Sequence, residues 1–148
     1  MPGKSSAVRR AAIQSSLTAK DIMEQSVLAA TPRASLRDVA SQLVTNQISG
    51  MPVAADDGRV IGVITEADII RALLEGKRIE NLTASDVMTG PPITVDQNTS
   101  LEDVMKSLED NRIVRVPVTN DNILIGIIAR RDVIKAVLEP EFLTFGGL

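Results

Sequence analysis

The stretch that decides the fold is GVITEADIIRALLE at residues 62–75, because it returns as GIIARRDVIKAVLE at residues 126–139. The two stretches are identical at 7 of 14 positions. Upstream, residues 19–53 match residues 84–118 at 12 of 35 positions, with an offset of 65 instead of 64. The offset changes where ADDG at residues 55–58 shortens to NDN, and turns tolerate such deletions. The sequence is therefore an internal duplication, and each copy should form the same structural unit.

Local signals predict the same element order in both copies. An entry turn with a Thr-x-x-Asp capping signal begins at Thr18 or Thr83. An extended stretch and a helix follow, and the helix is N-capped by Ser35 or Ser100. Two short strands joined by a tight turn come next, and a last helix completes the copy. Its predicted bounds are Thr65 to about Glu75, ended by Gly76, and Ala129 to about Glu139.

The apolar pattern indicates how these elements are buried. The second strand of the first copy, residues 60–64, is apolar on both faces, which predicts that both faces are covered. The first helix of each copy should bury one apolar face. That face consists of Leu36, Val39, Ala40, Leu43 and Val44 in one copy, and of Leu101, Val104, Met105 and Leu108 in the other.

The predicted fold class is α+β or α/β, with tandem pseudo-twofold βαββα repeats whose small sheets carry helices on one side. One copy of about 55 residues is marginal alone, so the two copies should stack. The predicted segments are an N-terminal extension (1–17), a first repeat (18–76), a linker (77–82), a second repeat (83–139) and a C-terminal tail (140–148). A helix is predicted within the extension, over residues 5–17. The tail is either docked through Phe142 and Phe145 or disordered.

Composition excludes several classes of function. Without cysteine there are no disulfides, thiolate metal sites or thiol nucleophiles. Without histidine the chain lacks the commonest general base and metal ligand. The net charge is −3, the basic residues are scattered and two phenylalanines are the only aromatic residues, which argues against nucleic-acid binding. We therefore expect neither an enzyme nor a metal site.

The apolar runs also bear on location. They are shorter than the roughly 20 residues that a membrane-spanning helix needs. Residues 1–10 are polar and contain no apolar segment of a secretory signal. The expectation is a cytoplasmic protein without membrane contact.

Four ordered motifs, each present twice, resemble those of a CBS domain. They are DIM and DVM, SLRDV and SLEDV, ISGMPV and VRVPV, and GVITEAD and GIIARRD. Across residues 18–139 the chain resembles a CBS-domain pair, or Bateman module. The resemblance implies a stand-alone regulatory module that binds AMP, ADP, ATP or S-adenosylmethionine in clefts between the repeats, needs no resident cofactor, and forms a homodimer.

By resemblance, ribose recognition falls to Thr65 and Asp68 of the Gly-h-h-Thr-x-x-Asp motif. In the second copy Asp132 remains while Ala129 replaces the threonine. A carboxylate can accept hydrogen bonds from both ribose hydroxyls. Thr65 and Asp68 are also an ordinary helix-capping pair, so capping alone stays open as their role. Capping explains Asp132 less well, since its threonine partner is missing.

The resemblance also implies a slot for the base and cations for phosphate. The base slot is lined by Leu28, Ile93, Thr94, Gly50, Met51, Pro52, Val116 and Pro117. The phosphate candidates are Arg115, Arg130 and Arg131. Core packing is the alternative for the apolar residues, and a solvated surface position is the alternative for the arginines. Because all three arginines lie in the second copy, they favour a phosphorylated ligand over adenosine.

Two functions remain open on the sequence. One is a sensor of adenine nucleotides that signals by a change of conformation or oligomeric state. The other is a ligand-free dimerisation or protein-interaction module with an unidentified partner.

Overall fold

The computed structural model describes residues 16–146, and the side chains up to residue 138. The predicted helix of the N-terminal extension therefore lies outside the described residues except for its last two positions, as do the side chains of Phe142 and Phe145. The chain forms two compact units. The first-repeat unit consists of Val27–Ile93 with Asp121–Leu124, and the second-repeat unit consists of the remaining described residues.

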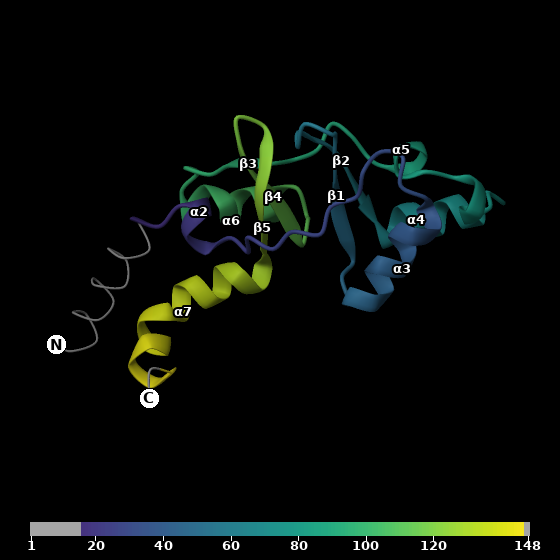
Figure 1. Ribbon diagram of the computed structural model, residues 1–148. Helices are drawn as coiled ribbons and strands as arrows, with labels where there is room; N and C mark the ends of the chain where they lie inside the picture. Colours follow the sequence, from purple (N-terminus) through teal and green to yellow (C-terminus); the bar gives the residue numbers. More distant parts are fainter. Residues whose placement is uncertain (1–15, 147–148) are drawn as a thin grey trace. The chain divides into compact units, whose positions relative to one another are not determined.

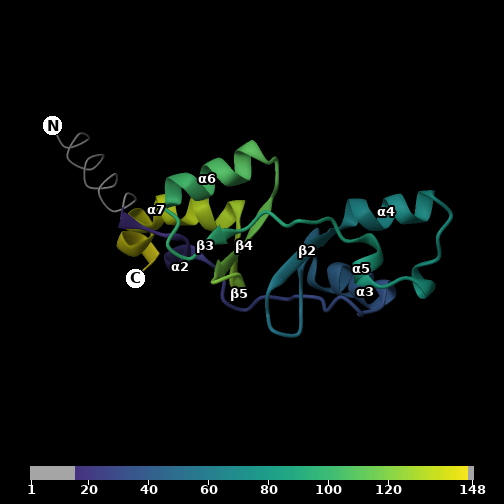
Figure 2. The ribbon, with the colours of Figure 1, turned by 90° about the horizontal axis from the view of Figure 1, so that it is seen from above.

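The first-repeat unit carries a two-stranded sheet with helices on one side (Figures 1 and 2). Its elements are α3 (Leu36–Asn46), β1 (Gly50–Ala54), β2 (Val60–Thr65), α4 (Glu66–Leu74), a 3-10 helix (Ile79–Asn81) and α5 (Ala84–Val87). The strands β1 and β2 are antiparallel. The predicted first strand is reduced to a single parallel bridge from Ala30 to Val53.

The second-repeat unit repeats this plan with a three-stranded sheet ordered β3-β4-β5 (Figure 1). Its elements are α2 (Ala19–Ile22), β3 (Val95–Asp96), α6 (Leu101–Asp110), β4 (Arg115–Asn120), β5 (Ile123–Ala129) and α7 (Arg130–Gly146). Strand β3 is parallel to β4. The turn between β4 and β5 holds Asp121 and Asn122 at φ +50° and +68°, the left-handed geometry of a tight hairpin.

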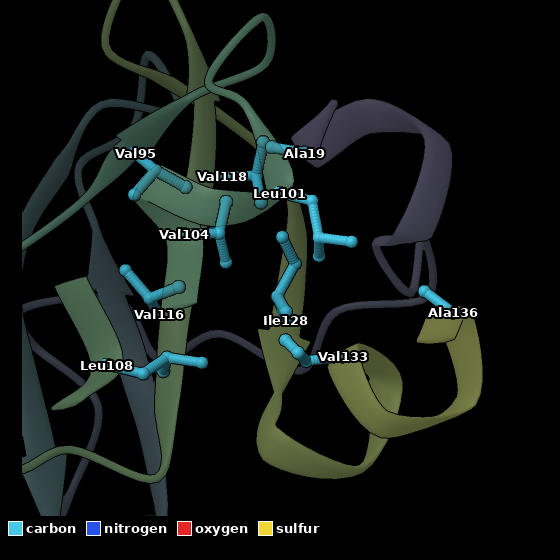
Figure 3. Close-up of a cluster of buried hydrophobic side chains, with 10 residues drawn as sticks. All are labelled: Ala19, Val95, Leu101, Val104, Leu108, Val116, Val118, Ile128, Val133 and Ala136. Atoms are coloured by element: carbon cyan, nitrogen blue, oxygen red, sulfur yellow. The ribbon is translucent and has the colours of Figure 1, made fainter. Parts of the chain in front are cut away.

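Each unit has its own apolar core. In the second-repeat unit, side chains from the sheet and from α6 and α7 converge on one cluster (Figure 3). This cluster consists of Ala19, Val95, Leu101, Val104, Leu108, Val116, Val118, Ile128, Val133 and Ala136. The core of the first-repeat unit consists of Ala30, Leu36, Val39, Leu43, Met51, Val53, Ile64, Ile69 and Ala84.

The entry turns do not pack on the repeats that follow them in the chain. The turn before the first repeat, with Ala19 fully buried, joins the core of the second-repeat unit. The turn before the second repeat, with Ala84 fully buried, joins the core of the first-repeat unit. Each compact unit is thus completed by the entry turn that precedes the other repeat in the chain.

A methionine at the end of each entry turn covers a strand glycine of the unit that it joins. A Cβ at Gly62 would lie 2.6 Å from the Met88 sulfur, and a Cβ at Gly126 would overlap the Met23 sulfur. These contacts explain why the Asp-h-Met motif and the strand glycine both recur in the duplicated sequence.

Local predictions from capping are confirmed. The Ser35 and Ser100 hydroxyls accept hydrogen bonds from the Asp38 and Asp103 N–H groups, at 3.0 and 3.1 Å. Gly76 follows α4 with φ +81°, a helix-ending geometry that favours glycine.

Three local expectations are wrong. Val44 on α3 is 78% exposed and Met105 on α6 is 39% exposed, so neither belongs to the buried face. Helix α7 continues to Gly146, beyond the predicted end near Glu139. At the position that corresponds to Gly76, the second copy has Pro140 and therefore no glycine to end the helix in the left-handed conformation.

The contact between Met23 and Gly126 predicts that a side chain at position 126 lowers the stability of the fold. We expect Gly126→Ala to lower the free energy of unfolding by about 1–3 kcal/mol, because the new methyl group overlaps Met23. Met23→Ala in the same chain should recover part of that loss, which gives a coupling energy of about 1 kcal/mol in a double-mutant cycle followed by urea unfolding. Strictly additive effects would show that the two residues do not contact each other.

The hydrogen bonds in the entry turns predict that the free energy of unfolding falls at acidic pH. The Thr18 N–H and hydroxyl donate to Asp21 at 2.8 and 2.9 Å, and Thr83 donates to Asp86 in the same way at 2.8 and 3.0 Å. These bonds, the backbone N–H first, hold the pKa of both carboxyl groups below the ordinary aspartate value. The turns therefore add stability above the unfolded pKa of about 4, and that stability is lost as the pH falls through the folded pKa.

We expect the double variant D21N/D86N to lose less stability than the parent chain between neutral pH and pH 3. Thermal unfolding across this range measures the difference. D110N, at an exposed acid on α6, provides the control for the removal of a carboxylate charge. Equal slopes for the parent chain and D21N/D86N would contradict the assignment.

Candidate functional site

The predicted site residues divide into two groups, one in each unit. Leu28, Gly50, Met51, Pro52, Thr65, Asp68 and Ile93 lie in the first-repeat unit. Thr94, Arg115, Val116, Pro117, Arg130, Arg131 and Asp132 lie in the second-repeat unit.

Backbone hydrogen bonds hold the start of each last helix against the residue that precedes the first hairpin strand. The Glu66 N–H donates to the Ser49 carbonyl at 2.8 Å, and the Arg130 N–H donates to the Val114 carbonyl at 3.2 Å. In the first-repeat unit Gly50 stands opposite Thr65 in the strand register. A Cβ at Gly50 would lie 2.9 Å from the Ile64 carbonyl oxygen, so this close approach requires glycine. The same framework therefore presents the motif aspartate in both units.

Asp68 is buried and fully hydrogen-bonded. Its side chain is 6% exposed. Oδ2 accepts from the Thr65 N–H at 2.9 Å and from the Thr65 hydroxyl at 3.1 Å. Oδ1 accepts from the Thr89 hydroxyl at 3.1 Å and from the Arg71 guanidinium at 3.2 Å. Thr65 also caps α4, since its hydroxyl accepts from the Asp68 N–H at 3.3 Å.

Asp132 occupies the corresponding place with far fewer partners. Its Oδ2 accepts from the Ala129 N–H at 2.8 Å, so the carboxylate also caps α7. Among the described residues, Oδ1 of Asp132 has no hydrogen-bond donor. The side chain is half-buried, and no buried side-chain nitrogen or oxygen in the described part of the chain lacks a partner. This oxygen therefore meets solvent and can accept a hydrogen bond from a ligand.

Of the three candidate arginines, Arg130 and Arg131 directly precede Asp132 in the chain, whereas Arg115 lies 17 residues before it. Arg130 and Arg131 occupy the first turn of α7, and both are exposed. The Arg130 Nε–H donates to the Ile113 carbonyl at 3.2 Å, which holds this side chain beside the start of β4. Arg115 is half-buried at the first position of β4. The unpaired N–H groups of a first helical turn carry partial positive charge, to which Arg130 and Arg131 add two cationic side chains at this helix end.

The predicted base-slot residues are of two kinds. Met51, Pro52, Val116 and Pro117 are buried, and Met51 and Val116 belong to the two cores. Core packing thus accounts for these two side chains, and only their main chain remains for a ligand. Leu28 and Ile93 are 41% and 39% exposed, and Thr94 is half-buried, so these side chains retain accessible surface.

Sequence reasoning missed Thr89 and Arg71 as partners of Asp68. Thr89 lies 21 residues away and reaches Asp68 because its backbone pairs with Val63, with hydrogen bonds of 2.9 and 3.0 Å. Arg71 follows Asp68 by one helical turn, a spacing that predicts an ion pair. For Thr89 the only sequence signal was its position directly after the repeated Asp-Val-Met motif.

Two further observations concern other kinds of site. The described residues contain no group of three or more Asp or Glu side chains arranged to hold a metal ion. Among the helices of the described region, none is both long and apolar enough to cross a membrane.

The geometry defines a protein of paired βαββα repeats, each with a carboxylate in the first turn of its last helix. The family model of the CBS domain matches residues 19–75 and again 84–139. The chain therefore belongs to the CBS-domain family, and it contains a pair of these domains.

Relatives differ in how much of their length the chain covers. It is 34% identical over 116 residues to the uncharacterized protein MJ1225 of Methanocaldococcus jannaschii, which corresponds to 78% of this chain but 41% of that protein. It is 29% identical over 129 residues to hypoxic response protein 1 of Mycobacterium tuberculosis, covering 86% of this chain and 90% of that protein.

Solved structures of similar chains include complexes with AMP and with other adenosine derivatives. The structure of CBSX2 in complex with AMP, a protein known from Arabidopsis thaliana, matches with a TM-score of 0.73 and 28% identity over 84% of this chain and 98% of that one. The CBS-domain pair of protein MJ0100, in complex with 5-methylthioadenosine and S-adenosyl-L-methionine, matches with a TM-score of 0.71 and 27% identity over 80% of this chain and 98% of that one.

Proposed function

We propose that the chain is a regulatory module that binds an adenosine-containing ligand, and that Asp132 of the second repeat receives the ribose. The observation that carries the proposal is the free Oδ1 of Asp132, beside a helix end rich in positive charge. The complexes of CBSX2 with AMP and of MJ0100 with two adenosine derivatives support the ligand class.

The ribose contact follows from the chemistry of the carboxylate. An ionised carboxylate accepts hydrogen bonds only, so it matches the hydroxyl donors of a ribose and stays unpaired with an acceptor. Oδ2 of Asp132 is held by the Ala129 N–H, which fixes the orientation of the group, while Oδ1 remains accessible. A ligand hydroxyl on Oδ1 therefore replaces water without breaking a protein hydrogen bond.

Phosphate groups fit the cations around the same helix end. Arg131 is exposed one residue before Asp132, and Arg130 and Arg115 lie at the start of α7 and β4. Guanidinium groups and the N–H groups of a helix start both favour anionic oxygens. We assign phosphate binding chiefly to Arg131, and we place the base along the half-buried Thr94 of the same unit.

This proposal predicts selective loss of affinity. Asp132→Asn should weaken AMP binding at least tenfold in isothermal titration, because an amide presents only one acceptor oxygen. Arg131→Ala should weaken ATP more than adenosine, since it removes a positive charge near the phosphates. Asp103→Asn is a matched control, because Asp103 is an exposed acid in the first turn of α6. If the parent chain binds neither AMP, ADP, ATP nor S-adenosylmethionine, the proposed function is wrong.

A second candidate is a module that acts by self-association, as the predicted homodimer requires. The supporting observation is an apolar stripe on α4, where Ile70, Leu73 and Leu74 are 55%, 50% and 83% exposed. The spacing places these residues on one helix face. Ile134 and Leu138, at the corresponding positions of α7, are 60% and 39% exposed. Because the stripe recurs in both repeats, a surface used for self-association explains it better than a chance distribution of exposed apolar residues does.

Charge substitutions in the stripe test this candidate. We expect I70E/L74E to shift the chain from dimer to monomer in sedimentation velocity, because burying two carboxylates in an apolar contact is costly. K106E, at an exposed lysine on α6, should leave the oligomeric state unchanged. A parent chain that is already a monomer at high concentration would remove the basis for this candidate.

A further inference from the structure

The two motif aspartates have opposite surroundings, although the same backbone presents them. A carboxylate offers about four acceptor positions. In Asp68 four donors already occupy them: the Thr65 N–H and hydroxyl, the Thr89 hydroxyl and the Arg71 guanidinium. A ribose could bind Asp68 only by displacing protein donors.

One of these donors is held firmly in place. Thr89 exchanges two backbone hydrogen bonds with Val63 of β2, at 2.9 and 3.0 Å. Its hydroxyl therefore reaches Asp68 from a fixed backbone position and links the chain after α5 to the start of α4. Arg71, by contrast, is 65% exposed and makes the more easily displaced contact.

The second copy retains the backbone pairing, but in the described structure Asp132 receives none of the corresponding side-chain hydrogen bonds. Glu24 corresponds to Thr89 and exchanges hydrogen bonds of 2.8 and 3.0 Å with Ile127, the counterpart of Val63. A carboxylate at this place cannot donate as the threonine hydroxyl does. Ala129 and Lys135 stand where the first copy has Thr65 and Arg71, and neither a hydrogen bond nor an ion pair joins Lys135 to Asp132 in the described structure.

We infer that Asp68 is a structural clasp closed by Thr65, Arg71 and Thr89, and that each chain therefore binds a single adenosine nucleotide, at Asp132. This inference rests on the proposed function for the ligand class. The two copies of one motif then have different tasks: Asp68 has a structural role where the resemblance implied a ribose contact, and Asp132 binds the ligand.

The first test separates stability from affinity in the full-length chain. Asp68→Asn should lower the melting temperature of the unliganded protein by several degrees while AMP binding, followed by isothermal titration, stays within about twofold at the test temperature. Asp132→Asn should show the reverse pattern: an almost unchanged melting temperature and at least tenfold weaker AMP binding. The parent chain should bind one AMP per chain.

A milder pair of variants serves if Asp68→Asn fails to fold. Thr89→Val removes only the hydroxyl donor and should lower the melting temperature, whereas Thr89→Ser should restore it. A Thr89→Val chain with an unchanged melting temperature would overturn the clasp.

The decisive variant transplants the clasp into the second repeat. The triple variant E24T/A129T/K135R supplies Asp132 with the donors that surround Asp68. It should raise the melting temperature and weaken AMP binding at least tenfold. Unchanged AMP affinity in a folded triple variant, or two AMP molecules per parent chain, would overturn the inference.

Failure of the proposed function gives a different pattern. If no adenosine ligand binds the parent chain, the ligand class and the assignment of a nucleotide to Asp132 are both wrong. The structural role of Asp68 is then tested by the melting temperature alone. It is supported if Asp68→Asn and Thr89→Val lower the melting temperature and Asp132→Asn does not. Any other result would contradict it.

Discussion

Two short backbone bridges, Val63 with Thr89 and Ile127 with Glu24, are the constraint on which the rest of the structure depends. Each attaches the chain after an entry turn to the second hairpin strand of the unit that this turn completes. The bridge places the residue after the Asp-h-Met motif near the first turn of the last helix. In the first-repeat unit this residue is Thr89, whose hydroxyl donates a hydrogen bond to Asp68. In the second-repeat unit it is Glu24, which cannot donate such a bond, and the Asp132 Oδ1 has no donor among the described residues.

Because the entry turns are exchanged, each repeat completes the core of the unit that contains the other repeat. Ala84 and Met88 complete the first-repeat unit, while Ala19 and Met23 complete the second-repeat unit. A single repeat with its own entry turn lacks the segment that closes its core, and at about 55 residues it has little apolar surface in reserve. Once two copies share one fold in this way, each motif can diverge without losing its backbone position. The first copy has kept a closed hydrogen-bond network, and the second presents an acceptor and cations.

Much of the fold was predictable because its signals are local. The caps at Ser35 and Ser100, the glycine stop at Gly76 and the tight turns each depend on residues within one helical turn or hairpin. Internal repetition then extended each local prediction to the second copy. The exposure of Val44 was not predictable from periodicity, since the apolar pattern continues past the point where the core ends.

The site was only half predictable for a physical reason. The motif identified both aspartates, but whether a carboxylate is free depends on tertiary neighbours. Thr89 comes to Asp68 through strand pairing across 21 residues, and no spacing rule in the sequence specifies that contact. Likewise, the burial of Met51 and Val116 in the cores depends on which side of the hairpin faces the helices.

A crystal structure of the full chain grown with AMP would show directly which aspartate receives the ribose. We expect a ribose hydroxyl within hydrogen-bond distance of Asp132 Oδ1, with the bonds from Thr89 and Arg71 to Asp68 intact. A ribose bound to Asp68 in place of Thr89, with Asp132 left in solvent, would contradict this expectation.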